Sequence, residues 1–377
     1  MDNVILLLLI LILIILLILI LSKKKMSYLN YNSTYYFEGG KFNPSDVNYS
    51  EIIDIKNEEA KLKAWLIQYV NAPEDTKVIF NSGSTESIAN LIFWAKSYNK
   101  YGVVYGSKLD HISVEKNCKN FDVEYKKLSL NKLKKLDIPE DASMIFITGV
   151  SSANGDIYPI EQIKRYQYLA EEGGDIDQDN MRQYRPLKVF DATQCIGKVK
   201  IDMKKDDLNA VFFSLHKIGG NINEGILIIH DMKDCEFKPL ICGTQQDKLR
   251  GGTYNVYDYI GTDKLIMNFE KRFNREECKK VKKMIEDMLD DAEIEYDKND
   301  KLDNIGNTIL IHLGFCNAGL IRELADNRIY VSGVSACNAE SGEIDDTLRI
   351  SYLNDEDINK QVIKKMIKLI KEYRDNN

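Results

Sequence analysis

The sequence predicts an α/β fold built on a mostly parallel β-sheet, followed by a smaller α+β domain. Three observations predict it. Continuous apolar, β-branched runs alternate with helical segments between residues 58 and 230, which is typical of parallel strands covered by helices on both faces. A long charged amphipathic segment changes the pattern after residue 262. With 377 residues, the chain is also long enough for two subdomains.

The large domain is expected at residues 26–261, and its elements follow from the apolar pattern. Apolar spacing in "EEAKLKAWLIQYV" predicts a helix at 58–70. Residues 172–186 are polar, contain Gly and Pro and lack periodicity, so they are predicted to be a surface insertion. The remaining expected elements are helices at 85–99 and near 160–171, and strands at 77–80, 101–105, 143–150, 188–192, 210–214 and 225–230.

The small domain is expected at residues 262–377. Its first element is predicted to be one long amphipathic helix over 265–291. The pattern then predicts strands and helices in alternation, ending in a Lys-rich helix: a strand at 307–313, a helix at 317–327, strands in 329–335 and 347–353, and a helix at 356–374.

The N-terminus carries an uninterrupted apolar run from Val4 to Leu21, followed by lysines 23–25. As a helix the run would span ~27 Å, close to the thickness of a bilayer core. We therefore expect residues 1–25 to be a single-pass membrane anchor with its basic flank. By the positive-inside rule, these lysines predict that the main domain faces the cytoplasm. A removed signal peptide fits less well, because a basic start and a cleavage site are missing. The alternative is that translation starts at Met26.

Composition excludes several classes of function. The 51 basic and 58 acidic residues give a net charge of −7 and are mixed along the chain, so no basic stripe indicates nucleic-acid binding. The seven cysteines are scattered and form no CxxC pair or His/Cys cluster. A metal site is therefore not expected, and scattered thiols suit a reducing compartment.

A lysine and an aspartate lie where a cofactor would bind. In "FFSLHKIGG", Lys217 lies between an apolar strand and a glycine-rich turn, and a desolvated lysine there is a usable amine nucleophile. Asp191 ends another apolar strand, and the carboxyl ends of strands bind ligands in open α/β sheets. A lysine with an acid that pairs with a protonated ring nitrogen is what pyridoxal phosphate needs. The alternative for Lys217 is a surface lysine at a strand end.

The stretch "FNSGSTESIANLIFWA" reads as a strand, a turn and the start of a helix. Gly83, Ser84 and Thr85 offer amide groups, hydroxyls and a helix N-terminus, which together form a phosphate cradle. The stretch does not match the P-loop pattern, so ATP is disfavoured. A capping box, with Ser82 or Ser84 as the cap, is a compatible structural explanation.

Seven short motifs in order carry a resemblance: SGSTES, DH at 110–111, DATQ, SLHK, RGGT, SGVSAC and LRIS. In this order they resemble the class V pyridoxal-phosphate enzymes, and among these the NifS-like cysteine desulfurases. The resemblance extends from about residue 28 to 375. It implies a type I fold of pyridoxal-phosphate-dependent transferases, pyridoxal 5'-phosphate as cofactor and L-cysteine as substrate. It also implies a homodimer with shared active sites that donates sulfur to Fe–S cluster or thiolation pathways, through an acceptor that the sequence does not identify.

The resemblance also assigns roles to single residues. Cys337 is implied to be the nucleophile that takes sulfur from L-cysteine as a persulfide, for which it must be a thiolate. Arg349 is implied to grip the substrate carboxylate, a task that suits a guanidinium. The other roles concern the cofactor: Lys217 bonds to it covalently and removes the substrate proton, Asp191 pairs with the pyridinium, Gln194 lies near ring O3', His111 stacks on the ring, Ser84, Thr85, Ser214 and His216 lie near the phosphate, and Thr253 is donated by the partner subunit.

The chain departs from the family pattern after strand 143–150. "SSANGDIYPI" places Ser152 where these enzymes have an asparagine that contacts cofactor and substrate, and Asn154 is the candidate to compensate. The stretch between Cys337 and Arg349 is short for this cysteine motif. Two alternatives stay open: a class V aminotransferase or lyase acting on another amino acid, in which Cys337 is incidental, and a degenerate membrane-tethered scaffold.

Overall fold

The computed structural model describes residues 27–28, 52–129, 132, 139, 141–158, 186–231, 236–254, 256–298, 302–333 and 345–376. The predicted anchor at 4–21, the helix near 160–171, nearly all of the 172–186 insertion and Cys337 lie outside these residues. Within the described part of the chain, no helix is long and apolar enough to cross a membrane.

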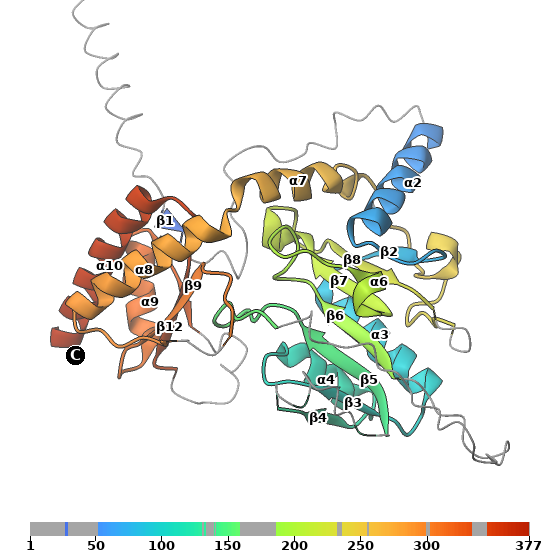
Figure 1. The fold of residues 1–377 in the computed structure, drawn as a ribbon, viewed down its shortest axis with the longest axis horizontal. Coiled ribbons are helices and arrows are strands. Elements are labelled where there is room, and N and C mark those ends of the chain that lie inside the picture. Colours follow the sequence, from blue (N-terminus) through green and yellow to red (C-terminus); the bar gives the residue numbers. More distant parts are fainter. Residues whose placement is uncertain are drawn as a thin grey trace, which may run out of the picture.

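A seven-stranded sheet forms the centre of the large domain, in the order β2-β8-β7-β6-β5-β3-β4 (Figure 1). Neighbouring strands from β7 to β4 are parallel, while β8 runs antiparallel between β2 and β7. This confirms the predicted mostly parallel α/β fold. The strands are β2 (Lys77–Asn81), β3 (Val103–Gly106), β4 (Tyr125–Lys127), β5 (Ala142–Thr148), β6 (Leu187–Asp191), β7 (Ala210–Ser214) and β8 (Gly225–Ile229).

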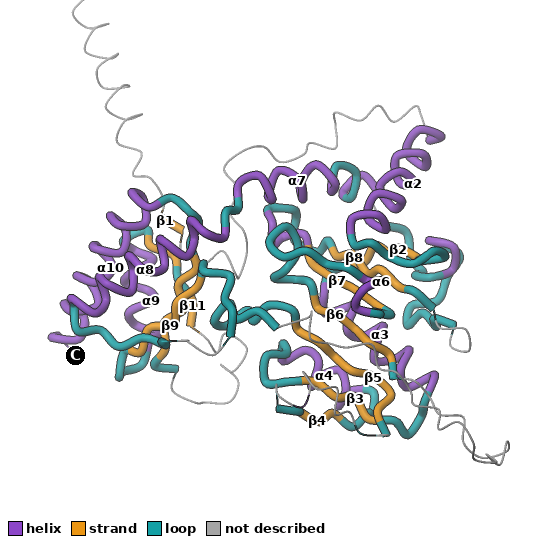
Figure 2. The backbone as a smooth tube through the Cα atoms, viewed as in Figure 1, coloured by secondary structure: helices purple, strands orange, loops and turns teal. Residues whose placement is uncertain are grey.

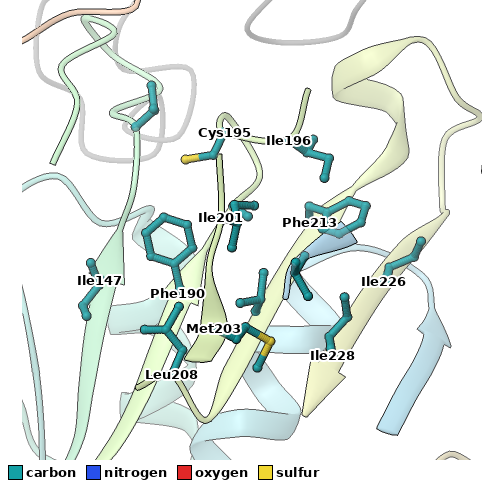
Figure 3. Packing of buried hydrophobic residues seen from close by; sticks show 14 of the residues in the cluster. Ile147, Phe190, Cys195, Ile196, Ile201, Met203, Leu208, Phe213, Ile226 and Ile228 are labelled. Carbon is teal, nitrogen blue, oxygen red and sulfur yellow. The ribbon is translucent and has the colours of Figure 1, made fainter. Parts of the chain in front are cut away.

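Both faces of this sheet are buried under helices. Alternate residues of a strand point to opposite faces, so Ile226 and Ile228 of β8 join one core while Leu227 and Ile229 join the other. The first core packs against α2 (Ile52–Tyr69) and α7 (Thr262–Arg272), and Figure 3 shows part of it. The second packs against α3 (Ser84–Tyr98) and α4 (Ile112–Asn120). Short helices complete this region: α6 (Met203–Asp206) and the 3₁₀ turns η3 (Leu215–Ile218), η4 (Gln246–Lys248) and η5 (Val256–Asp258).

The C-terminal region has its own antiparallel sheet and core. The sheet order is β11-β12-β9, and its helices pack on it in the orange and red part of Figure 1. A parallel pair of short strands joins residues 27–28 to the same region. The elements are α8 (Arg275–Asp291), β9 (Thr308–His312), α9 (Asn317–Asp326), β10 (Ile329–Tyr330), β11 (Ser332–Gly333), β12 (Thr347–Ser351) and α10 (Glu356–Asn376), with β1 (Ser27–Tyr28) beside β10.

The prediction of one helix over 265–291 was wrong, because the segment folds as α7 and α8. The side chain of Asn274 accepts hydrogen bonds from the backbone N–H groups of Glu276 and Glu277, and such a cap starts a new helix. Phe273 before the break packs in the large-domain core, whereas Val281 after it packs in the C-terminal core. The chain therefore changes cores within α8, and the predicted domain boundary at 261/262 stays a prediction.

A polar contact holds the loop after β5 against the C-terminal region. The N–H of Ile157 donates to the carbonyl of Asp303 at 2.7 Å, and the N–H of Ile305 donates to the carbonyl of Gly155 at 2.9 Å. Asn304 Nδ2 donates to Asp156 Oδ1 at 3.0 Å. This contact fixes the loop that carries Ser152, so it positions one side of the site described below. Figure 2 shows the loop (teal) crossing from the large sheet toward the C-terminal strands.

Candidate active site

A cavity of about 230 Å³ opens at the carboxyl ends of β2, β3, β5, β6 and β7. These strands run in one direction, so their following loops meet at one edge of the sheet, where open α/β sheets bind ligands. The cavity brings together most of the predicted site residues: Ser84, Thr85, His111, Ser152, Asp191, Gln194, Ser214, His216 and Lys217.

Hydroxyl groups and a helix N-terminus form one end of the cavity. Ser84 Oγ lies 2.7 Å from Thr193 Oγ1 and 2.8 Å from Ser214 Oγ, and the N–H of Ser84 donates to Ser214 Oγ. Gly83 precedes α3 with φ 137°, and a Cβ there would lie 3.3 Å from Ser214 Oγ. Amide and hydroxyl donors at a helix N-terminus suit a phosphate. The N-cap of α3 is Gly83, without a side-chain cap, so the alternative explanation of a capping box at Ser82 or Ser84 does not hold.

Asp191 lies at the end of β6 and is buried, with 7% of its surface exposed. Its Oδ1 accepts a hydrogen bond of 2.8 Å from the N–H of Thr193. Burial raises the pKa of Asp191, while the hydrogen bonds from Thr193 and the charge of Lys217 oppose the rise. A buried carboxylate facing a cavity is stabilised by a cation, so the site favours a ligand with a protonated nitrogen at this position.

Two histidines in the cavity are neutral near pH 7. Burial and the charge of Lys217 lower the pKa of His111, and the same causes lower the pKa of His216 to about 4. Nδ1 of His111 accepts a hydrogen bond from the N–H of Ser113. An amide N–H can only donate, so the ring proton of neutral His111 lies on Nε2. His111 also caps α4 through this contact.

Asp110 holds the turn that carries His111, although sequence reasoning gave it no role. Its carboxylate accepts hydrogen bonds from Thr148 Oγ1 (2.7 Å), Tyr125 OH (2.9 Å) and the N–H of Ser107 (2.8 Å). Burial nevertheless raises the pKa of Asp110 to about 6. Because Thr148 also lines the cavity, this network ties the loop after β3 to the end of β5.

Arg349 on β12 does not line the cavity itself, but it contacts a residue that does. Its Nε donates to Ser332 Oγ at 3.1 Å, and its Nη1 donates to the carbonyl of Ser152 at 2.9 Å. Only 8% of Arg349 is exposed. Since Ser152 lines the cavity, this contact places a guanidinium next to the cavity, beside the position where the family has an asparagine that contacts cofactor and substrate.

Among the described residues, three predicted site residues do not line the cavity: Arg349, Asn154 and Thr253. The amide of Asn154 is bonded to Asp156, with Nδ2 donating to Oδ2 at 2.8 Å, and Asn154 does not line the cavity. Thr253 is exposed and does not line it either. The family resemblance assigns Thr253 to the site of a partner subunit.

Other lining residues were missed by sequence reasoning. Thr193 is the clearest case, because it lies inside the DATQ motif and contacts Ser84. Thr148 could have been suspected as a polar residue at the end of a buried strand. Ser82 and Glu86 lie inside the SGSTES motif in the same way. The remaining ones have no sequence signal of their own and are Ile88, Ser113, Val150, Ile222 and Asn223.

Comparison with known proteins decides the family. The sequence model of the aminotransferase class-V family matches residues 36–360. The chain belongs to the class-V aminotransferase family. It is 25% identical over 352 residues to cysteine desulfurase IscS of Buchnera aphidicola (subspecies Acyrthosiphon pisum, strain 5A), covering 89% of this chain and 81% of that protein.

Solved structures agree with the fold. A NifS-like protein superposes with a TM-score of 0.74 at 20% identity, covering 92% of this chain and 100% of that structure. A cystine C–S lyase, solved in complex with cysteine persulfide, superposes with a TM-score of 0.70 at 12% identity, covering 91% and 98%. The predicted type I fold of pyridoxal-phosphate-dependent enzymes is therefore confirmed.

Members of this family use pyridoxal phosphate, and the cavity of this family member fits it. Lys217 supplies an amine, Asp191 a buried carboxylate for a protonated ring nitrogen, and the hydroxyls of Ser84, Thr193 and Ser214 an anion site. The chain is a pyridoxal-phosphate-dependent enzyme, as predicted.

Proposed function

We propose that this class-V family member is a cysteine desulfurase that converts L-cysteine to L-alanine and holds the sulfur on Cys337. The observation that carries the proposal is the contact of Arg349 with Ser152 at the rim of the cavity that contains Lys217, Asp191 and His111. A guanidinium beside Ser152 would anchor the carboxylate of an amino acid next to the cofactor residues. The SAC motif at 335–337 and the similarity to IscS along most of the chain support the same reaction.

The residues divide the work between binding and proton transfer. Arg349 binds the carboxylate of L-cysteine. Lys217 Nζ removes the proton from substrate Cα, and Nε2 of His111 moves protons within the cavity. Asp191 holds the cofactor's ring nitrogen in its protonated form. When bound, the cofactor supplies a ring that stores the electron pair released from Cα.

The sulfur transfer balances without an added oxidant. The Cys337 thiolate attacks the sulfur of L-cysteine, a sulfur–sulfur bond forms and the carbon–sulfur bond of the substrate breaks. Cβ takes a proton, so alanine leaves while Cys337 keeps the sulfur as a persulfide. An acceptor thiol or an added reductant then removes the sulfur and restores Cys337.

The test uses the full chain, L-cysteine and a reductant, with alanine and sulfide as the measured products. We expect both products in equal amounts from the wild type and at least ~100-fold less from Cys337→Ala, because nucleophilic catalysis depends on the attacking group. Cys316→Ala, which removes an exposed thiol, is the matched control. Absence of alanine from the wild type, or an undiminished yield from Cys337→Ala, would overturn the proposal.

A C–S lyase is the second candidate, favoured by the fold match to a cystine C–S lyase. The two reactions are separated by their products. A lyase releases pyruvate and ammonia in place of alanine, and its rate is unchanged in Cys337→Ala. Transfer of an amino group to an added keto acid would identify an aminotransferase instead.

We also propose that the enzyme is a homodimer whose partner subunit contributes Thr253, supported by the exposure of Thr253 in the RGGT segment. Mixing inactive Lys217→Ala and Thr253→Ala subunits tests this, because one site of each mixed dimer then carries neither change. Recovery of activity is expected; additive inactivity would contradict shared sites.

The third proposal is that residues 4–21 anchor the enzyme in a membrane with the catalytic domain facing the cytoplasm, supported by the apolar run and the lysines after it. The full chain should sediment with membranes after alkaline extraction, while Leu9→Asp/Ile12→Asp should release it. Equal sedimentation of both, or of neither, would contradict the anchor.

A further inference from the structure

Glu86 places a carboxylate beside the predicted phosphate site. It lies in the first turn of α3 and lines the cavity. Acidic side chains and phosphate groups are both stabilised by the partial positive charge at a helix N-terminus. Two anions at one helix N-terminus also repel each other. An uncompensated Glu86 would therefore weaken the binding of any phosphate at this position.

Arg250 compensates this charge. Its Nε donates to Glu86 Oε1 at 2.9 Å and its Nη2 donates to Glu86 Oε2 at 3.3 Å. The two side chains are 18% and 11% exposed, so the pair is shielded from solvent and from salt. Such a forked arginine–carboxylate contact fixes geometry as well as charge.

The local hydrogen bonds keep Glu86 ionised. The N–H and the hydroxyl of Ser82 both donate to Glu86 Oε2, at 2.9 and 2.7 Å. Burial raises the pKa of Glu86, but the hydrogen bonds from Arg250 and Ser82 outweigh burial and lower it. Glu86 therefore stays negatively charged near neutral pH, and Arg250 is the cation that neutralises it.

The backbone holds Arg250 in place. The N–H of Gly251 donates to the carbonyl of Ile241 at 2.7 Å, and the N–H of Gly252 donates to Gln245 Oε1 at 3.0 Å. A Cβ on Gly251 would lie 2.1 Å from the carbonyl oxygen of Cys242. Only glycine therefore allows this close approach, which fixes the guanidinium beside α3.

We propose that Arg250 is a positioning residue for cofactor binding: by neutralising Glu86, it keeps the first turn of α3 open to the phosphate of pyridoxal phosphate. The ion pair leaves no net charge beside the hydroxyls of Ser84 and Ser214. The inference rests on the cofactor and is independent of the substrate, so it stands whether the enzyme proves to be a desulfurase or a lyase.

The effect of a second substitution on phosphate affinity separates this role from a purely structural one. Arg250→Gln leaves Glu86 as an unpaired anion beside the phosphate. Adding Glu86→Gln removes that anion, so affinity for the phosphate should return. If the pair served only to hold the segment 250–253 against α3, the double variant would bind as weakly as Arg250→Gln or more weakly.

The experiment measures cofactor affinity of the full chain, freed of cofactor, by absorbance titration with pyridoxal phosphate and separately with pyridoxal. Arg250→Gln should bind pyridoxal phosphate at least ~10-fold more weakly, because a tenfold loss of affinity corresponds to only about 1.4 kcal/mol of repulsion. Its affinity for pyridoxal, which lacks the phosphate, should be unchanged within ~2-fold. Glu86→Gln/Arg250→Gln should recover to within about threefold of the wild type. Arg275→Gln, which removes an arginine bonded to Asp303 and Asn304, is the matched control.

Arg250→Lys keeps the charge and tests the same inference if Arg250→Gln does not fold. It should bind pyridoxal phosphate within about threefold of the wild type, because a lysine still neutralises Glu86. Three results would overturn the proposal. The double variant could fail to recover its affinity for pyridoxal phosphate. Arg250→Gln could lose affinity for pyridoxal and pyridoxal phosphate equally, or Arg250→Lys could lose affinity for both compounds.

Discussion

The two ends of the cavity are built in different ways. The cofactor end draws its side chains from the ends of several strands of one sheet, and its hydroxyls contact one another directly. The carboxylate end depends on Arg349, which comes from the C-terminal sheet and contacts the large domain through the carbonyl of Ser152. With Arg349 in its proposed role, cofactor binding is a property of the large domain, whereas substrate binding requires the two domains to stay in contact.

Removing Lys217 breaks the cofactor end most severely. Lys217→Ala is expected to lower turnover at least ~10⁴-fold, because it removes both the covalent attachment and the base. Its absorbance spectrum should lose the band of lysine-bound pyridoxal phosphate. The control is Lys200→Ala, which removes an exposed lysine from the loop after β6. Retained turnover in Lys217→Ala would contradict the assignment of the whole cavity.

A change at the other end tests whether the two ends are separable. Arg349→Lys keeps the charge but loses the fork, so the KM for L-cysteine should rise ~10- to 100-fold while cofactor affinity stays within ~2-fold of the wild type. Steady-state kinetics and cofactor titration on the same protein measure both. A parallel loss of cofactor affinity would show that the carboxylate end supports the cofactor end, against the division drawn above.

The burial of each element explains how far the sequence predicted the fold. Strands buried on both faces are continuous apolar runs, so β2 and β7 were predicted to within a residue. The edge strand β4 was missed, because its residues, Tyr125–Lys127, are largely exposed and carry no apolar signal. α4 was missed as well, since only Ser113, Val114 and Cys118 of its residues are buried.

For the site, residue type and position near a strand end were enough to select Lys217 and Asp191, and the family resemblance added Ser214. Contacts between distant segments were not predictable. Glu86 and Arg250 are 164 residues apart, and only the fold shows that they meet. Asn154 does not line the cavity for a local reason: its amide forms hydrogen bonds with Asp156 in its own turn. Short polar side chains often bond to nearby groups of their own turn in this way.

Packing behind the cofactor end offers a milder test. A Cβ on Gly149 would lie 2.2 Å from Phe190 Cζ and 2.5 Å from Cys195 Sγ, both fully buried. Gly149→Ala is therefore expected to lower the free energy of unfolding by about 1–3 kcal/mol. It should also weaken cofactor binding, because Asp191 follows Phe190 in the chain and its carbonyl contacts Cys195 Sγ. Thermal unfolding and cofactor titration measure the two effects. Gly314→Ala meets no atom within 4 Å but has φ 73°, so its loss of roughly 1 kcal/mol should leave cofactor binding unchanged.

We expect low pH to reduce the stability of the fold slightly through protonation of His216. Burial and the charge of Lys217 lower its pKa to about 4 in the folded protein, whereas an unfolded histidine titrates near ~6.5. The unfolded chain therefore binds the proton first, and stability is lost as pH falls from about 6.5 toward 4. Because His216 is partly exposed, solvent screening reduces the loss to about 1 kcal/mol at pH 5.

Thermal unfolding of cofactor-free wild type and His216→Gln between pH 7 and pH 5 isolates this effect. The pKa of Asp110, raised to about 6, acts in the opposite direction, since its burial penalty disappears as pH falls. Both proteins share Asp110, so its contribution cancels in their difference. The wild type should lose more stability than His216→Gln over this range. Parallel losses would mean that His216 is hydrated in the cofactor-free protein, and the cofactor end would then be more open to water than its buried hydroxyl network indicates.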